Sequence, residues 1–222
     1  MFKTLDWHIN EEIGFIELNQ PPSNSMTRLF FHEIREMADI LLNKKTVKGI
    51  IISGNGRHFS SGADINDLLD FDPADPMVAE DFYFANSQTF KRFYTAKIPV
   101  VAAIKGVCIG SAMELAMACH FRLATENVLM GFPEAGFNLM PGCGGSFYLS
   151  ELLDTKSVME LLISGRNLNI FEALDLGVVD CAVAKKELIE KAVTFVKEIQ
   201  HNYHYSCRSY YVKKYLKDNP DE

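Results

Sequence analysis

The sequence has no excess of positive charge, no long uncharged apolar run and no paired pattern of cysteines. Its 222 residues include 22 Lys and Arg against 29 Asp and Glu, which gives a formal net charge of −7. Phosphate backbones must be met by a surplus of cations, so this balance disfavours a general nucleic-acid binder. Hydrophobic residues make up 48% of the chain and include 16 Phe, enough buried surface to rule out disorder as the main state.

The most apolar stretch, Ile98–Cys119, is interrupted by Lys105 and Glu114. Both charges would lie near the middle of a bilayer, which is costly, so the stretch is better explained as a buried strand, a turn and a buried helix. The N-terminus lacks a basic segment followed by an apolar core, which is the pattern of a signal peptide. We therefore expect a cytoplasmic protein that has no membrane partner.

The cysteines are odd in number and have no paired spacing, so we expect reduced thiols that pack in the interior rather than disulfides. They are Cys108, Cys119, Cys143, Cys181 and Cys207. Metal-like spacing occurs at His201, His204 and Cys207, but a fourth ligand is missing and ordinary surface residues are favoured. Motifs of serine hydrolases and of phosphate-binding loops are absent, so neither class has support.

Apolar periodicity predicts one α/β domain with strands early and helices late, without repeats or a low-complexity linker. The predicted strands are Leu5–Ile9, Ile13–Leu18, Gly49–Ser53, Val100–Ile104, His120–Ala124 and Leu129–Gly131. Predicted helices include Phe30–Leu41, Val78–Ala96, one that begins near Ser111, Ser146–Leu153, Lys156–Ser164, one from Ile170 with a capping box of Asn169 and Glu172, and an apolar stripe over Leu188–Ile199. An acidic loop is expected at Phe71–Asp75. The aromatic residues of the 78–96 helix favour core or subunit packing over a role in lining a pocket.

Small residues follow predicted strands in three segments, 59–65, 106–116 and 132–136. A bulky side chain would block close approach to the peptide N–H groups, so these segments favour ligand binding by backbone amides. A helix that starts at Ser111 also directs its unbonded N–H groups and positive dipole end toward such a ligand.

These segments belong to an ordered set of motifs through which the sequence resembles the crotonase superfamily, the enoyl-CoA hydratase/isomerase fold, over nearly its whole length. The motifs are Leu18-Asn19-Gln20-Pro21 with Asn24 and Met26, Ser61-Gly62-Ala63-Asp64-Ile65, Ile98–Ile104, Glu114-Leu115-Ala116, Pro133-Glu134, and Pro141-Gly142-Cys143-Gly144-Gly145. The resemblance implies a crotonase-like spiral of β-β-α repeats over residues 1–185. It also implies a C-terminal helical segment over residues 186–222, shorter than is usual in the family, and assembly into homotrimers or dimers of trimers.

The resemblance also implies a site without metal or redox cofactor. Glu114 and Glu134 match the catalytic carboxylates of the family's hydratases, and the backbone N–H groups of Ser61 and Ser111 are assigned to the oxyanion hole. Further ligand contacts are expected from Ser60, Gly62, Ala63, Asp64, Ile65, Gly110, Pro141 and Gly142. Coenzyme A is the expected carrier of the acyl group, with an acyl-carrier-protein thioester as the alternative.

A hydratase is the favoured activity, because water addition to a 2-enoyl thioester needs one group to take a proton and one to deliver a proton. The alternatives are an isomerase, another acyl-thioester enzyme, and a non-catalytic acyl-CoA-binding protein. Two positions depart from the family pattern. Ser111-Ala112 replaces Gly-Gly, which costs on the order of 1 kcal/mol if the backbone requires a positive φ, and Phe147-Tyr148 replaces Gln-Arg.

Overall fold

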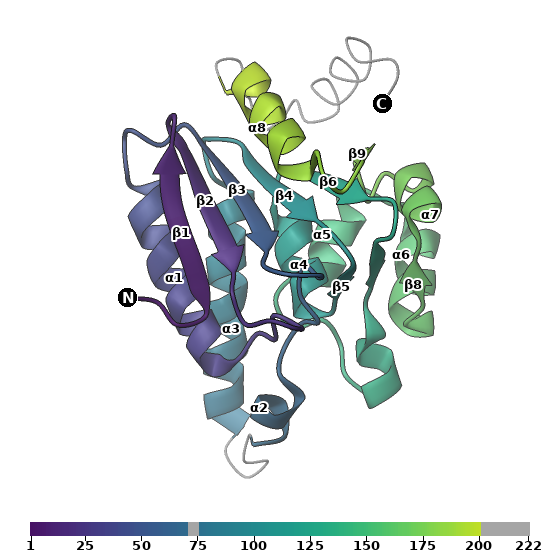
Figure 1. Cartoon of the computed structure of the whole chain (residues 1–222). Helices are drawn as coiled ribbons and strands as arrows, with labels where there is room; N and C mark the ends of the chain where they lie inside the picture. The colour runs from purple at the N-terminus through teal and green to yellow at the C-terminus, as the bar shows by residue number, and fades with distance from the viewer. Residues whose placement is uncertain (71–75, 201–222) are drawn as a thin grey trace.

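The computed structural model of the chain describes residues 1–70 and 76–200, and its largest element is a six-stranded sheet (Figure 1). The strand order is β1 (Leu5–Asn10), β2 (Ile13–Leu18), β3 (Gly49–Gly54), β4 (Val100–Ile104), β6 (Phe121–Thr125) and β9 (Cys181–Val183). Only the β1–β2 hairpin is antiparallel within this sheet, and the other neighbours are parallel. A smaller sheet contains β5 (Val107–Ile109), β7 (Leu129–Gly131) and β8 (Asn167–Leu168).

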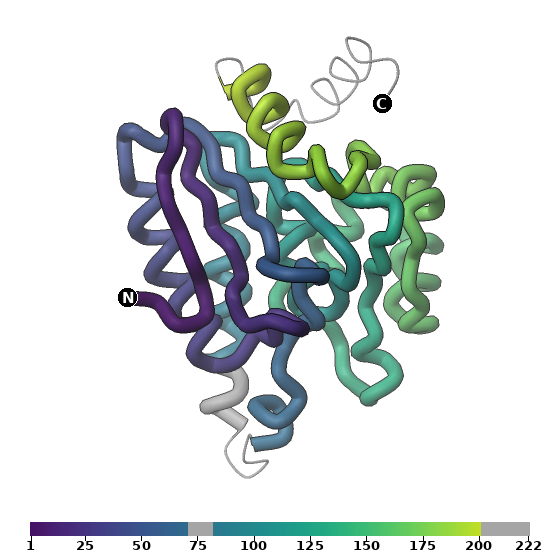
Figure 2. Tube along the Cα trace, viewed as in Figure 1, coloured from purple at the N-terminus to yellow at the C-terminus, as the bar shows by residue number. Residues whose placement is uncertain are grey.

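Helices cover both faces of the large sheet (Figures 1 and 2). The helices of the described chain are α1 (Arg28–Leu42), α2 (Ile65–Leu69), α3 (Pro76–Tyr94), α4 (Ser111–Ala118), the 3₁₀ helix η1 (Pro133–Phe137), α5 (Gly145–Ser150), α6 (Thr155–Ser164), α7 (Ile170–Asp175) and α8 (Leu188–Ile199). The face that packs against α1, α3 and α4 forms the larger core, and α8 covers the opposite face.

The two cores follow from the two-residue period of the strands. In β3, Ile50 and Ile52 point into the larger core, while Ile51 points toward α8. Since successive side chains of a strand alternate between faces, a strand buried on both sides is a continuous apolar run. The runs Gly49–Ser53 and Val100–Ile104 predict this placement.

Several predicted elements are confirmed. The strand Val100–Ile104 and the helix start at Ser111 are found as predicted, and the Asn169–Glu172 capping box forms at the start of α7. The bounds predicted for Ile13–Leu18, Leu129–Gly131 and Leu188–Ile199 are also found. Several other boundaries differ by one to a few residues, as at the strand predicted from His120, which begins at Phe121. The short elements β5, β8, β9, α2 and η1 were not predicted, because segments of two to five residues carry too little periodicity.

Four of the predicted free thiols, at Cys108, Cys119, Cys143 and Cys181, are confirmed as free and buried. The predicted loop at 71–75, the histidines at 201 and 204, Cys207 and the rest of the C-terminal segment beyond residue 200 lie outside the described residues. Within the described ranges, no helix is both long and apolar enough to cross a bilayer.

Backbone pairing around the smaller sheet brings the small-residue segments together. Isolated parallel bridges join Met26 to Ala63 and Ser60 to Cys108, and Gly110 N donates to Gly131 O at 2.9 Å. The chain therefore places the 60–65 segment, the start of α4 and the end of β7 next to one another. This cluster of backbone forms the frame of the candidate site.

Candidate active site

Helix α4 is buried along its whole length, and it carries Glu114 in its first turn. Gly110 caps the helix with φ +58° and makes no side-chain cap hydrogen bond. Ser111 and Ala112 have ordinary helical backbone, since neither has a positive φ. The replacement of Gly-Gly by Ser111-Ala112 therefore causes no backbone strain, because the positive φ falls one residue earlier, on glycine.

The Glu114 side chain is fully buried, and only one of its oxygens is engaged. Its Oε1 accepts hydrogen bonds from Cys143 N at 2.7 Å and Gly145 N at 2.8 Å. Its Oε2 has no hydrogen-bond partner among the described residues. Burial, and to a smaller extent the charge of Glu134, raises the pKa of Glu114 to about 7, against the opposing effect of the two N–H donors. Such a group can hold or release a proton near neutral pH.

Glu134 lies in the first turn of η1, directly after Pro133. Its Oε2 is likewise buried and has no partner among the described residues. A Cβ at Gly110 would lie 3.3 Å from Glu134 Oε1, so this carboxylate stands at the start of α4. Burial raises its pKa, and it is near enough to Glu114 for their charges to interact. The structure thus brings the two predicted glutamates together, each with one unused oxygen.

The predicted role of Ser61 in the oxyanion hole is wrong, because its amide is already used. Ser61 N donates to Ser23 O at 2.9 Å. The parallel bridge to Met26 uses Gly62 O and Asp64 N, so the Ala63 amide between them faces the other way and has no acceptor among the described residues. Ala63 lies two residues after Ser61 in the same motif. An amide bound within the fold cannot donate to a substrate, so Ala63 is the better donor.

The amide of Ser111 is the second unused donor near this motif. As the first residue of α4 it has no acceptor inside the helix, and none occurs elsewhere in the described chain. Gly62, with φ +83°, lies so near that a Cβ there would be 3.2 Å from Ser111 N. The Ala63 and Ser111 amides therefore flank one small volume at the positive end of α4.

Two other predicted ligand contacts have structural roles instead. Ser60 is fully buried, and its hydroxyl donates to Asn24 O at 2.6 Å and accepts from Gly62 N at 3.0 Å. Asp64 caps α2 by accepting from Asn66 N, and it also accepts from Ser25 Oγ. Their side chains shape the loop rather than face a ligand. Of the other predicted contacts, Gly62 lies beside Ser111 at the start of α4, Gly110 lies beside Glu134, and Gly142 lies beside Tyr83. Ile65 is 54% exposed.

Three side chains near Glu114 were missed at the level of sequence. Cys143, Tyr83 and Tyr148 all have raised pKa values, caused first by burial and then by neighbouring charges that include Glu114. The aromatic richness of α3 and the Phe147-Tyr148 pair were visible in the sequence. No pattern in the sequence showed which of these rings would reach the carboxylates.

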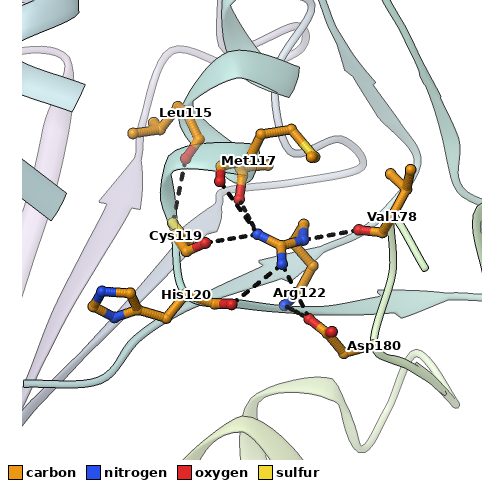
Figure 3. Close-up of polar contacts among 8 residues, drawn as sticks. Leu115, Met117, Cys119, His120, Arg122, Val178 and Asp180 are labelled. Carbon is orange, nitrogen blue, oxygen red and sulfur yellow. Dashed lines mark hydrogen bonds and ion pairs between the residues drawn. The ribbon is translucent and has the colours of Figure 1, made fainter. Parts of the chain in front are cut away.

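The opposite end of α4 is closed by Arg122, which is 1% exposed (Figure 3). Its guanidinium donates to the carbonyl oxygens of Ala116, Cys119 and Val178 at 3.0, 2.6 and 2.8 Å. It also forms an ion pair with the buried Asp180 at 3.3 Å. These contacts fix the helix that carries Glu114 from its far end.

No group of three or more His, Cys, Asp or Glu side chains suited to a metal ion occurs in the part of the chain that the structure describes. The chemistry available from these residues is proton transfer by two carboxyl groups beside two backbone N–H donors. Such a site stabilises an oxyanion that develops at one atom while a proton moves at another.

Comparison with known proteins identifies relatives by sequence and by fold. A sequence profile described as "Enoyl-CoA hydratase/isomerase" matches residues 8–218. A probable enoyl-CoA hydratase of Bacillus subtilis (strain 168) is 34% identical over 187 residues, which cover 83% of this chain and 71% of that protein. The crystal structure of an enoyl-CoA hydratase from Bacillus anthracis is 26% identical with a TM-score of 0.83, covering 90% of this chain and 78% of the other.

A further solved structure, from Thermobifida fusca YX and in complex with CoA, shares the fold at a TM-score of 0.83 and 23% identity. It covers 97% of this chain and 85% of that one. The agreement extends over the whole α/β architecture, so the predicted fold class is confirmed.

Proposed function

The chain belongs to the enoyl-CoA hydratase/isomerase family, and we propose that it adds water across the double bond of a 2-enoyl thioester. One observation carries the choice of hydration. Glu114 and Glu134 lie together, and each keeps a buried oxygen without a partner among the described residues. A buried polar atom without a partner costs free energy, which is tolerated where it serves a substrate.

In the proposed reaction the thioester oxygen accepts hydrogen bonds from Ala63 N and Ser111 N. These donors stabilise the negative charge of the enolate, and each such donor contributes about 3 kcal/mol to the transition state. The dipole of α4 acts in the same direction because its N-terminus faces the oxygen. Neither donor has to be released from an internal hydrogen bond first.

The two carboxyl groups divide the proton transfers. One carboxylate takes a proton from water as the oxygen attacks the β-carbon, and the other group, in its protonated form, delivers a proton to the α-carbon. Burial, and to a smaller extent the charge of Glu134, favours the protonated form of Glu114, so this group can supply the proton near neutral pH. The pKa of Glu134 is also raised by burial, and that of Glu114 is raised to about 7. The product is a 3-hydroxyacyl thioester, and the reaction requires neither a metal nor a redox cofactor.

Coenzyme A is the carrier that we propose for the acyl group. The family assignment and the CoA complex of the Thermobifida fusca structure support this choice. Ile65 is the first residue of α2 and lies two residues after Ala63. Its side chain is exposed and is therefore available for contact with the carrier. An acyl-carrier-protein thioester is tested by the same assay with that substrate. The predicted trimeric assembly stays a prediction.

The assay follows loss of the conjugated enoyl absorbance of a short 2-enoyl-CoA. We expect turnover by the wild-type protein and a loss of 10²- to 10⁴-fold in kcat for Glu114→Gln and for Glu134→Gln, because glutamine cannot transfer a proton. The exposed Glu126 supplies a matched control, and Glu126→Gln should keep the wild-type rate.

Other outcomes identify other functions. The protein would be an isomerase if Glu114→Gln shifted the double bond of a 3-enoyl substrate at nearly the wild-type rate while Glu134→Gln was inactive. Binding of CoA thioesters without turnover of any enoyl or acyl substrate would establish a non-catalytic binding protein, and hydration would be refuted.

A further inference from the structure

Tyr83 on α3 is in direct contact with the loop before α5. A Cβ at Gly142 would lie 2.8 Å from Tyr83 Cδ1, 3.1 Å from Cε1 and 3.6 Å from Cγ. These three ring atoms are its nearest neighbours outside the loop, and Gly142 has no positive φ. The absence of a side chain at this residue is therefore what allows the ring to lie on the backbone, and the reason is space rather than backbone conformation.

The same loop holds the Glu114 carboxylate. The N–H of Cys143, the residue after Gly142, and the N–H of Gly145 both donate to Glu114 Oε1. Displacement of this loop would move or remove both donors. We propose that Tyr83 is a positioning residue whose ring presses the loop against Glu114 and so fixes the carboxylate that the proposed hydration uses. The inference rests on that function for its kinetic tests, but not for its structural ones.

A second ring contacts the same loop at Gly144. A Cβ at Gly144, where φ is +106°, would lie 3.0 Å from Tyr148 Cε2. Tyr148 is buried in the core, whereas Tyr83 is only half-buried. The loop thus contacts one ring of the core at Gly144 and one ring of α3 at Gly142.

The titratable groups that face Glu114 are Glu134 from η1, Cys143 from the loop, Tyr83 from α3 and Tyr148 from α5. Burial and the charges of Cys143 and Glu114 raise the pKa of Tyr83, so its phenol stays neutral over the working range. Its proposed contribution is the contact of its ring with the loop rather than a charge.

The test compares Tyr83→Ala, Tyr83→Phe and Phe84→Ala. Phe84 is the next residue on α3 and is 64% exposed, so it controls for loss of an aromatic ring from this helix. We expect Tyr83→Ala to lower kcat about 10- to 100-fold, as a small misplacement of a reacting group does. Tyr83→Phe keeps the ring and should retain the wild-type kcat, as should Phe84→Ala.

A carbon-13 NMR titration of the Glu114 carboxyl supplies a readout that does not need turnover. Burial is the main cause of the raised pKa, so Tyr83→Ala should lower it toward 4.5 by admitting water, while Tyr83→Phe leaves it unchanged. An unchanged pKa and kcat in Tyr83→Ala would overturn the inference. Failure of the wild-type protein to hydrate any enoyl thioester would overturn the proposed function instead, and the titration would still decide the role of Tyr83.

A double-mutant cycle with Gly142→Ala separates positioning from general loss of packing. In the wild-type background the new methyl group meets the Tyr83 ring at 2.8 Å and should reproduce the effect of Tyr83→Ala. In the Tyr83→Ala background the clash is gone, so Gly142→Ala should lower kcat by a smaller factor than it does in the wild-type background. Additive losses in kcat would show that the ring and the loop act independently, and would refute the proposal.

Discussion

The polar groups at the two ends of α4 differ in whether they have hydrogen-bond partners within the described chain. At the C-terminal end, Arg122 donates to the carbonyls of Ala116, Met117 and Cys119, and it pairs with Asp180 (Figure 3). At the N-terminal end, the Ser111 amide has no acceptor and Glu114 Oε2 has no partner in the described ranges. Both ends are buried, so the difference is not one of exposure to water.

The contrast separates stabilising contacts from functional ones. A buried polar group that is satisfied within the fold holds the structure, whereas one left without a partner costs free energy that a bound substrate can recover. The two ends are also linked, since α4 is a rigid body of only eight residues. Arg122 can therefore hold Glu114 in place without touching it.

The largest expected effect comes from removal of Arg122, the cation at the C-terminal end of α4. Arg122→Met should lower the free energy of unfolding by about 3–5 kcal/mol, because a buried guanidinium is lost together with its hydrogen bonds to the Ala116, Cys119 and Val178 carbonyls and its ion pair with Asp180. Urea unfolding measures this, with Arg166→Met as control. Arg166 is 39% exposed in its ion pairs with Glu160 and Glu172, so its loss should cost no more than about 1 kcal/mol.

A structural role for the C-terminal end of α4 would be contradicted if Arg122→Met unfolded like the wild-type protein but lost activity per folded molecule. Arg122 would then act on the reaction rather than on the stability of the fold. Equal losses of stability from Arg122→Met and Arg166→Met would also contradict the importance of burial.

The next effect concerns the N-terminal end of α4 and is tested by removal of a single backbone N–H group. An ester in place of the Ala63 amide removes one N–H with little change of shape, and it should lower kcat about 10²- to 10³-fold through loss of an oxyanion donor. An ester at Ser61 removes the N–H that donates to Ser23 O. That change should cost about 1 kcal/mol of stability and leave kcat nearly unchanged. The reverse pattern would restore Ser61 as the donor.

The Ser61 correction shows how far the sequence predicts such a site. The motif around Ser61-Gly62-Ala63 identifies the right loop, and the long apolar runs predict β3, β4 and α4, because burial on both faces leaves a clear pattern. Which amide of the loop is unused depends on the bridge to Met26, 37 residues earlier in the chain. A pairing between distant segments leaves no local periodicity, so sequence reasoning chose the wrong residue.

The same limit applies to the side chains around Glu114. Burial of Glu114 is predicted by its apolar neighbours in α4, and the structure confirms it. The hydrogen bonds from Cys143 and Gly145 arise from a loop about 30 residues away, and Arg122 reaches the carbonyls through tertiary packing. Local patterns indicate what must be buried, whereas partners of buried groups are settled by the fold.

The smallest expected effect is a change of stability with pH, which measures the free-energy cost of burying the Glu114 carboxylate near the N-terminal end of α4. The pKa of Glu114 is 4.5 unfolded and about 7 folded, so the native state favours the protonated form. Its contribution to stability is present below pH 4.5 and is lost as pH rises through 7. Glu114→Gln has no such loss, so relative to wild type it should gain up to roughly 3 kcal/mol between pH 5 and pH 8. Urea unfolding at both values measures the gain, and an equal difference at the two pH values would show that the carboxylate meets no penalty at this end of the helix.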